Sequence, residues 1–240
     1  MEIFSMEGWY FLLRWFHFLA GITWIGILYY LNFVQTPFFG SELGGTAKSA
    51  MTRGLVPNAL WWFRWGAMFT FLTGWTIVLT KLHENGFGYL HSGYMTKILT
   101  GGFFGTIMWA NVWFVIWPAQ QVVIANANTV AGGGQANPAA AARGAKAGMA
   151  SRTNTLLSIP MLFFMAAASH FNALTQNLDT GGGALGVYWV VALLVMAALE
   201  ANALIGPGAK TQKMLTTVPG TIHGGLIVVI VLYLAQSVLL

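Results

Sequence analysis

The sequence contains no cysteine and few charged residues. Without cysteine the chain cannot form a disulfide, a thiolate metal site, an iron–sulfur cluster or the covalent attachment of a c-type haem, which requires C-x-x-C-H. Charged residues make up 7% of its 240 residues, whereas soluble domains contain about 25%. So little charge cannot cover a folded domain with a hydrated surface, so the composition predicts an integral membrane protein.

Long apolar stretches occupy most of the chain. A helix needs about 20 mostly apolar residues to cross a bilayer, and six stretches meet this need. The sequence therefore predicts an all-α fold, a polytopic transmembrane helix bundle of about six spans that forms a single domain over 1–240. An Ala/Gly-rich loop and helix at 125–152 joins the third span to the fourth. The expected spans are 9–34, 58–80, 98–123, 154–176, 184–206 and 219–240.

Basic residues are distributed unevenly between the two sides of this expected bundle. Because basic residues collect on the cytoplasmic side, the bias predicts that both termini are periplasmic and that 125–152 is cytoplasmic. The protein is then a multi-pass protein of a bacterial inner membrane, and its net charge of +5 does not indicate nucleic-acid binding. One side has Arg14, Lys81 and Lys97, and the other has Lys48, Arg53, Arg143, Lys146, Arg152, Lys210 and Lys213.

Two histidines lie within the apolar stretches, where ionisable side chains indicate function. His17 is in the first span and His170 is near the end of the fourth. These spans run in opposite directions, so both imidazoles are expected roughly 5–12 Å from the outer boundary, at a rise of 1.5 Å per residue. Two imidazoles from facing helices at one depth are a ligand set for haem b. The sequence thus predicts that His17 and His170 ligate its iron.

The neighbours of His17 favour the same interpretation. Gly21 and Trp24 follow it on one face of the helix, where the glycine leaves space for a flat macrocycle and the indole packs on its edge. Arg14 precedes His17 by one turn and is expected to pair with a haem propionate. The alternative is that both histidines form hydrogen bonds to neighbouring helices, as polar residues in spans often do.

A second group of polar residues is expected at a level nearer the cytoplasm. Arg64 is in the second span, Glu200 and Asn202 are in the fifth, and His223 is in the sixth. These residues are the candidates for a catalytic or proton-access site. The alternatives are an ion pair between Glu200 and Arg64, a second haem near His223, or a relay in a small transporter.

Four segments resemble the membrane domain of the bacterial membrane-integral urate oxidases, or urate hydroxylases. They are RWFHFLAGITWIGILYYLNFVQTPFF, ALWWFRWGAMFTFLTGW, MWANVWFVIWPAQQ and SRTNTLLSIPMLFFMAAASHF. The resemblance implies an inner-membrane domain joined to a C-terminal periplasmic cytochrome c, which receives electrons as urate is oxidised to 5-hydroxyisourate. A more distant similarity to haem-binding, membrane-integral protoporphyrinogen oxidases, in His17, Trp24 and Gly26, associates the first-span histidine with haem.

The sequence departs from this family pattern because it ends at Leu240 and has no cysteine for a covalent haem. We therefore expect a haem b redox protein that passes electrons to a separate periplasmic cytochrome c or another membrane redox subunit, in a homo- or hetero-oligomer. The alternative is a non-catalytic or haem-bearing accessory subunit of a larger respiratory or photosynthetic complex. Urate as the substrate is implied by the resemblance alone.

Overall fold

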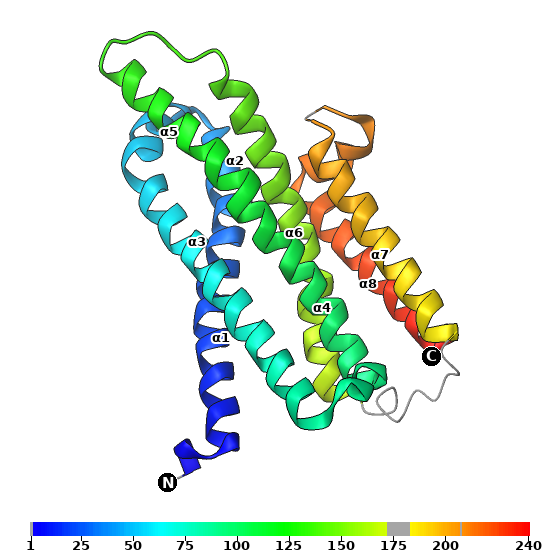
Figure 1. The fold of residues 1–240 in the computed structure, drawn as a ribbon. Coiled ribbons are helices and arrows are strands. Elements are labelled where there is room, and N and C mark those ends of the chain that lie inside the picture. Colours follow the sequence, from blue (N-terminus) through cyan, green and yellow to red (C-terminus); the bar gives the residue numbers. More distant parts are fainter. Residues whose placement is uncertain (1, 172–182, 207) are drawn as a thin grey trace.

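A computed structural model of the chain describes residues 2–171, 183–206 and 208–240. These residues form helices and connections without a strand, which confirms the predicted all-α class. The long helices run side by side as a bundle, and the N- and C-termini lie at the same end of it (Figure 1). We refer to this end as the lower end and to the opposite end as the upper end.

The chain follows a simple up-and-down path through the bundle (Figure 1). The segments η2 and η4 are π-helical and continue α1 and α4 without a break. The elements are η1 (Glu2–Phe4), α1 (Met6–Tyr29), η2 (Tyr30–Gln35), α2 (Thr36–Phe39), α3 (Glu42–Asn85), η3 (Phe87–His91), α4 (Gly93–Ala110), η4 (Asn111–Ile116), α5 (Trp117–Ala131), α6 (Ala140–His170), α7 (Gly183–Leu204), η6 (Lys210–Thr216) and α8 (Val218–Leu239).

Four helical segments of the described chain are long and apolar enough to cross a membrane: Met6–Phe39, Gly93–Ala131, Gly183–Leu204 and Val218–Leu239. These segments are consistent with a multi-pass membrane protein. The second and fourth predicted spans lie in α3 and α6, which are 44 and 31 residues long but less apolar. The count of six spans therefore stays a prediction, and residues 172–176 of the fourth lie outside the described residues.

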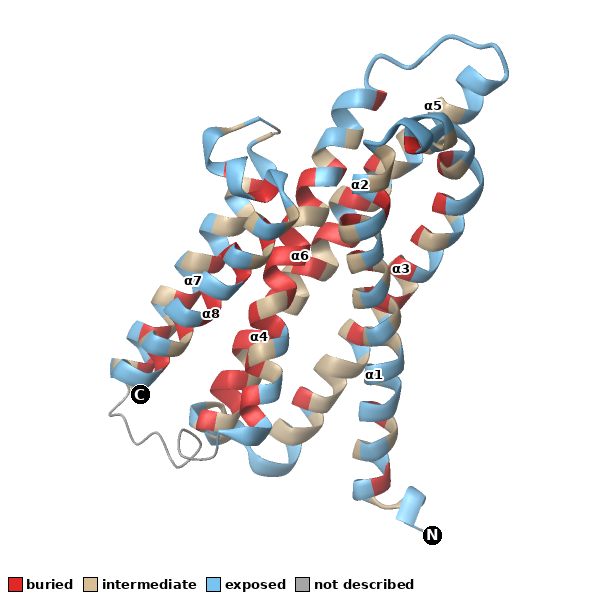
Figure 2. Cartoon of the chain, turned by 180° about the vertical axis from the view of Figure 1, so that it is seen from behind, coloured by how far each residue is buried: buried red, intermediate tan, exposed pale blue. Residues whose placement is uncertain are grey.

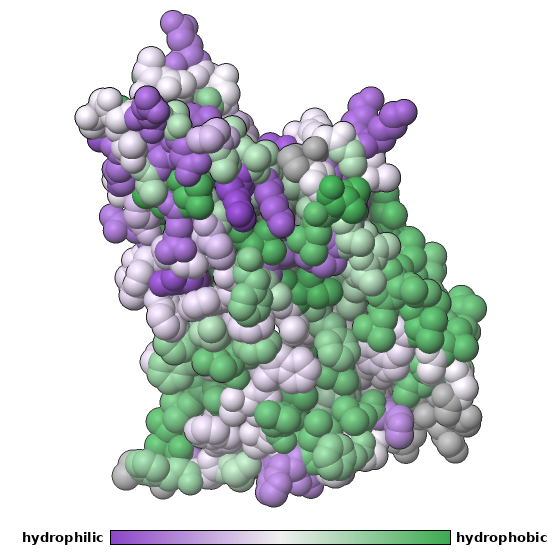
Figure 3. Space-filling view, turned by 45° about the horizontal axis from the view of Figure 1, so that its top comes forward, coloured by the Kyte–Doolittle hydropathy of each residue, from purple (hydrophilic) through white to green (hydrophobic). Residues whose placement is uncertain are grey.

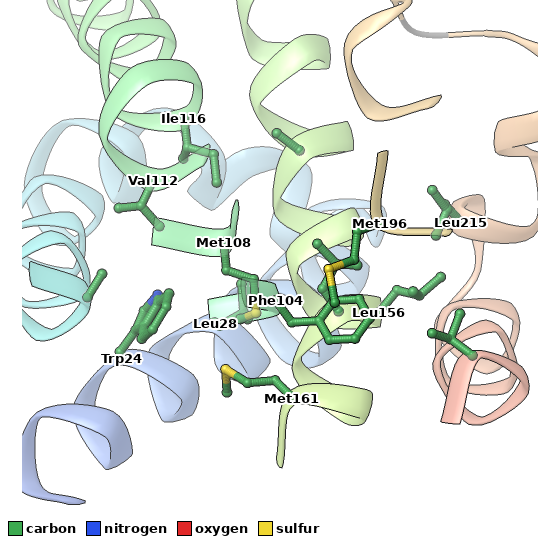
Figure 4. Packing of buried hydrophobic residues seen from close by; sticks show 14 of the residues in the cluster. Trp24, Leu28, Phe104, Met108, Val112, Ile116, Leu156, Met161, Met196 and Leu215 are labelled. Atoms are coloured by element: carbon green, nitrogen blue, oxygen red, sulfur yellow. The ribbon is translucent and has the colours of Figure 1, made fainter. Parts of the chain in front are cut away.

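Helix α6 lies at the centre of the bundle, and this position explains its moderate hydropathy. It packs against α1, α4, α5, α7 and α8, and most of its length is buried (Figure 2). Buried side chains of Leu156 and Met161 pack there with Phe104 and Met108 of α4 and Met196 of α7 (Figure 4). Because neighbouring helices shield α6 from lipid, it retains polar residues that a lipid-exposed helix would not.

Helices α1 and α3 form a closely packed pair beside this centre. A Cβ atom at Gly66 of α3 would lie 3.1 Å from the backbone nitrogen of Trp24 and 3.2 Å from the carbonyl oxygen of Ala20. The two backbones can approach so closely because glycine has no side chain, as is common between membrane helices. Helix α3 begins at Glu42, well before the predicted start at 58, and continues through Pro57.

The surface separates into apolar sides and a polar upper end (Figure 3). Large apolar side chains such as Phe18 and Ile22 are 65% and 72% exposed, which is expected of helices that contact lipid. The seven basic residues on the expected cytoplasmic side lie near the starts of α3 and α6 and in η6, at the upper end (Figure 1). The side of the membrane that each end faces remains a prediction.

Candidate functional site

His17 lies on the face of α1 that packs on α3. Its Nδ1 atom is 3.0 Å from Thr73 Oγ1, and that hydroxyl donates its own hydrogen to Phe69 O at 2.6 Å. Thr73 therefore accepts a hydrogen bond from Nδ1–H, which leaves Nε2 of the neutral ring as the basic nitrogen. Nε2 forms no hydrogen bond within the described part of the chain, so it is free to act as a ligand nitrogen.

His170 is the last residue of α6, and its side chain is exposed. A hydrogen bond of 2.8 Å between Tyr29 Oη and Ser158 Oγ joins α1 to α6. His17 and His170 each lie twelve residues below this contact, which is about 18 Å at 1.5 Å per residue. The two histidines are thus at a similar level. The helices α1 and α6 lie further apart at the lower end of the ribbon than at this contact (Figure 1), and ligation of one iron by both histidines stays a prediction.

The other predicted haem contacts also pack within the protein or lie on its surface. Trp24 is 1% exposed in the seam with α3, and Gly21 faces Thr70 of the same helix. The guanidinium of Arg14 is exposed and lies 5.7 Å from the centre of the Tyr10 ring. Haem binding by His17, His170, Arg14, Gly21 and Trp24 therefore stays a prediction, in which the free Nε2 of His17 is the clearest ligand atom.

Glu200 belongs to a buried polar network at the centre of the bundle. The Nδ2 group of Asn111 donates hydrogen bonds of 2.9 Å to Asn154 Oδ1 and to Glu200 Oε2. Asn154 donates in turn to Met108 O at 2.9 Å. The side chains of Asn111 and Asn154 are 1% and 0% exposed. The network therefore joins α4, α6 and α7 through polar groups that satisfy one another away from water.

Both π-helical segments place an asparagine against α6. Asn111 is the first residue of η4, and Asn32 lies in η2, from which it donates to Ser151 Oγ at 2.8 Å. The wider π-helical turn is rare and occurs mostly as single-turn bulges, frequently at functional sites. Its repeated use at one helix indicates that the contacts on α6 are a specific feature of this fold.

One turn of α6, Ser151–Thr155, provides these contacts, and we refer to it as the central polar turn. Ser151 and Asn154 bind the two asparagines just described. Arg152 Nη1 donates to Leu215 O of η6 at 3.1 Å. Successive residues of a helix point in different directions, so this turn contacts η2, η4 and η6 at once.

The other polar residues predicted near the cytoplasmic side, Arg64, Asn202 and His223, do not form one site with Glu200. The guanidinium of Arg64 lies 4.1 Å from the centre of the Trp117 ring and 5.0 Å from that of Trp113. These contacts are cation–π interactions, and no ion pair joins Arg64 to Glu200 in the described residues. The predicted alternative of a Glu200–Arg64 ion pair is therefore wrong, because Arg64 packs among aromatic rings.

Asn202 and His223 also lie apart from the network. Asn202 Oδ1 accepts a hydrogen bond from Thr211 Oγ1 at 2.5 Å, and its carbonyl oxygen accepts one from Gln212. Asn202 thus stabilises the connection from α7 to η6. The side chain of His223 is exposed on α8. Among the described residues, no group of three His, Asp or Glu side chains is arranged to hold a metal ion.

The residues that the sequence analysis missed are the buried asparagines, Asn32 and Asn154, and the role of Asn111. Ionisable groups alone do not reveal these residues. The signal that identifies the network is the presence of amide side chains within apolar stretches. Their partners are distant in sequence: Asn111 and Glu200 are 89 residues apart.

Comparison with known protein families shows to which family the chain belongs. Residues 83–233 match the model of the urate oxidase N-terminal family. The chain belongs to this family. The match confirms the resemblance stated above and contains Asn111, Asn154 and Glu200, whereas His17 precedes the matched region. No curated protein and no solved structure matches the chain.

Proposed function

We propose that the protein is the membrane domain of a urate hydroxylase, which oxidises urate and passes the electrons to a separate cytochrome c or another membrane redox subunit. The observation that supports this proposal best is the family match, which spans 83–233 and contains the Asn111–Asn154–Glu200 network. Glu200 is the one acidic residue in the helices α4 to α8. Glu200 is half-buried, and a lone carboxylate within a membrane bundle is a functional candidate by default.

The chemistry requires a proton acceptor. Conversion of urate to 5-hydroxyisourate adds the oxygen of one water molecule and releases two protons and two electrons. Glu200 is the residue that we assign to accept a proton, since an ionised carboxylate is a suitable general base. The hydrogen bond from Asn111 holds the carboxylate in place, and Asn154 orients the amide of Asn111.

Haem b is part of the proposal through His17. A bound haem would accept electrons one at a time and transfer them to the external carrier. His17 offers Nε2 as the ligand nitrogen, while Thr73 holds Nδ1 and thereby the orientation of the ring. His170, the second predicted ligand, is the exposed last residue of α6, and its part in the ligation is tested separately from that of His17.

The membrane placement completes the proposal. With the upper end in the cytoplasm and both termini in the periplasm, the basic residues follow the positive-inside rule. The lower end, with His17, then faces the compartment in which a periplasmic cytochrome c would collect the electrons. In this arrangement the protein is a multi-pass protein of a bacterial inner membrane.

The test is a turnover assay under anaerobic conditions with the full chain in lipid nanodiscs. Urate and oxidised cytochrome c are added, and the ultraviolet absorbance of urate is followed together with that of reduced cytochrome c. We expect two molecules of cytochrome c to be reduced for each urate consumed. If neither cytochrome c nor a quinone analogue is reduced, and the protein purifies within a larger complex, then the accessory-subunit alternative replaces this proposal.

A further inference from the structure

A cavity of about 270 Å³ lies near the upper end, where η2 and α2 meet α6 and the start of α8. The residues that line it include Asn32, Phe33, Thr36, Arg152, Thr155 and Thr221. Its volume is close to the lower limit of the roughly 300–1,000 Å³ of small-molecule sites. The cavity therefore suits a compact ligand and is too small for a haem.

The cavity has a positive charge that is not neutralised by its own walls. Arg152 lines it, and no carboxylate is among the lining residues. One N–H group of Arg152 binds Leu215 O at 3.1 Å, and a guanidinium has five such donors. The remaining donors of Arg152 are available to an anionic ligand, for which arginine is well suited because its donors form a rigid planar fork.

The threonines of the cavity wall present acceptors rather than donors. Thr155 donates to Ser151 O and Thr221 donates to Thr217 O, both at 3.0 Å, and Thr36 donates to Leu31 O at 2.7 Å. Each hydroxyl uses its one hydrogen on the backbone of its own helix, so its lone pairs remain for the cavity.

Asn32 adds a further acceptor to the same wall. It is 8% exposed, and its Nδ2 group donates to Leu28 O at 2.9 Å and to Ser151 Oγ at 2.8 Å. Both amide hydrogens are thus used within the protein. Its Oδ1 atom accepts no hydrogen bond from the described residues and is accessible. This wall therefore suits a ligand with hydrogen-bond donors.

The walls select the shape of the ligand as well as its polarity. Phe33 lines the cavity next to Pro37, and its ring stacks on Tyr29 with 4.9 Å between the ring centres. Flat apolar walls favour a planar ring system. The combination of a guanidinium, several acceptors and a planar apolar surface is unusual for a site that binds only a tetrahedral anion.

We infer that this cavity is a binding site for a planar oxopurine anion of the urate type, with its anionic oxygen edge on Arg152 and its N–H groups on Asn32 and the threonines. The inference rests on the proposed function, to which it adds the place where the substrate binds. A phosphate or lipid headgroup also carries negative charge, but it has no planar ring to lie against Phe33. Glu200 is not among the lining residues, so it would accept a proton from this site through intervening groups; Thr155 of the lining is next in sequence to Asn154 of its network.

The experiment measures urate binding to the full chain in lipid nanodiscs by equilibrium dialysis, without any electron acceptor. Adenine, which lacks the anionic oxygen edge, and inorganic phosphate, which has no ring, are the comparison ligands. We expect urate to bind and the other two not to compete. Arg152→Gln should weaken urate binding roughly 10- to 100-fold, since charge-assisted hydrogen bonds contribute about 1.5–3 kcal/mol.

Two further variants separate binding from folding. Arg143→Gln removes an exposed arginine from the same helix and should leave urate affinity unchanged. Thr221→Val keeps the shape of a residue that is 3% exposed and removes one acceptor, so it should weaken urate binding while the far-ultraviolet circular dichroism stays that of the wild type. Arg152→Lys, which retains the charge, should restore part of the affinity lost in Arg152→Gln if the chain is folded.

The outcomes distinguish this inference from the proposed function. Unchanged urate affinity in Arg152→Gln and Thr221→Val, or no urate binding at all, overturns the inference. Equal competition by phosphate also overturns it and indicates a phosphate or lipid-headgroup site. If turnover with cytochrome c persists in Arg152→Gln, the proposed function stands without this cavity. If urate binds in an Arg152-dependent manner but no acceptor is reduced, the cavity stands and the proposed function fails.

Discussion

Asn111 and Asn154 are joined by a hydrogen bond of 2.9 Å, and Asn111 uses its other amide hydrogen on Glu200 at the same distance. One side-chain amide thus connects α4 to both α6 and α7. Its two hydrogens have two oxygen acceptors, one of which is a carboxylate. This arrangement makes Asn111 the residue on which both the packing at the centre and the orientation of Glu200 depend.

Replacing Asn111 with leucine should destabilise the bundle by about 1–3 kcal/mol, because it leaves two buried oxygen acceptors without a donor. The expected result is a lower midpoint of unfolding in detergent, followed by circular dichroism. The matched control is Asn58→Leu. Asn58 is exposed and bonds only to Gly54 O of its own helix, so the midpoint should change little. Equal effects of the two variants would contradict the importance of the network.

Glu200→Gln should abolish most urate turnover while the fold persists. Glutamine keeps an oxygen acceptor for the hydrogen bond from Asn111 but cannot take up a proton at neutral pH. Loss of a general base typically lowers the rate about 10²- to 10⁴-fold. The measurement is cytochrome c reduction per molecule of protein. Glu42→Gln, in the first turn of α3, is the control, and a Glu200→Gln variant with wild-type turnover would remove Glu200 from the chemistry.

The histidines can be separated by optical spectra. The purified chain is expected to bind one haem b, and His17→Ala should remove the reduced-minus-oxidised signal of a b-type haem. Thr73→Val should shift or weaken the signal, because it releases Nδ1 of His17. His91→Ala, at an exposed position of η3, should have no effect. A wild-type spectrum in His17→Ala would end the assignment, and loss of the signal in His170→Ala would show that α1 and α6 approach each other below Tyr29.

Two glycines of α3 should respond in opposite directions to alanine. At Gly66 the new Cβ would lie 3.1 Å from the backbone of Trp24, whereas Gly54 has no atom within 4 Å. Gly66→Ala should therefore force α1 and α3 apart and cost about 1–3 kcal/mol. Gly54→Ala should stabilise the helix by up to about 1 kcal/mol. Thermal unfolding in one detergent compares both, and a stabilised Gly66→Ala variant would contradict the close packing of the seam.

The absence of cysteine makes the orientation directly measurable. Glu2→Cys labels the lower end, and Gln135→Cys, at an exposed position between α5 and α6, labels the upper end. In intact spheroplasts a membrane-impermeant maleimide should react with Glu2→Cys alone. After lysis it should react with both variants. The reverse pattern would place both termini in the cytoplasm.

Composition and hydropathy predicted the class and the approximate positions of the helices, because a bilayer imposes length and polarity on each span. They did not predict that α3 begins at Glu42 or that α4 continues through η4 to Ala131. Those boundaries depend on packing beyond the apolar stretch. An apolar stretch marks where lipid is the neighbour, and it gives no information on where a helix extends past it.

The candidate site was predicted less completely, and His17 shows the reason. His17, Gly21 and Trp24 do lie on one face of α1. However, a glycine next to an aromatic ring is expected both beside a haem and beside a closely packed helix. The neighbour turned out to be α3. Which of the two is present depends on which helix packs against α1, and the sequence of α1 does not contain this information. The same holds for Asn111, whose partners lie 43 and 89 residues away.

The position of α6 has a consequence for biogenesis. A helix with buried amide and hydroxyl groups such as those of Asn154 and Ser158 is costly to release into lipid on its own, because each polar group without a partner costs several kcal/mol in hydrocarbon. Helices α4 and α5 are synthesised before α6, so α6 is expected to enter the membrane against them, with Asn154 covered by Asn111, and to be enclosed when α7 and α8 follow. Membrane insertion of this protein is thus a cooperative event among neighbouring helices rather than a sequence of independent steps.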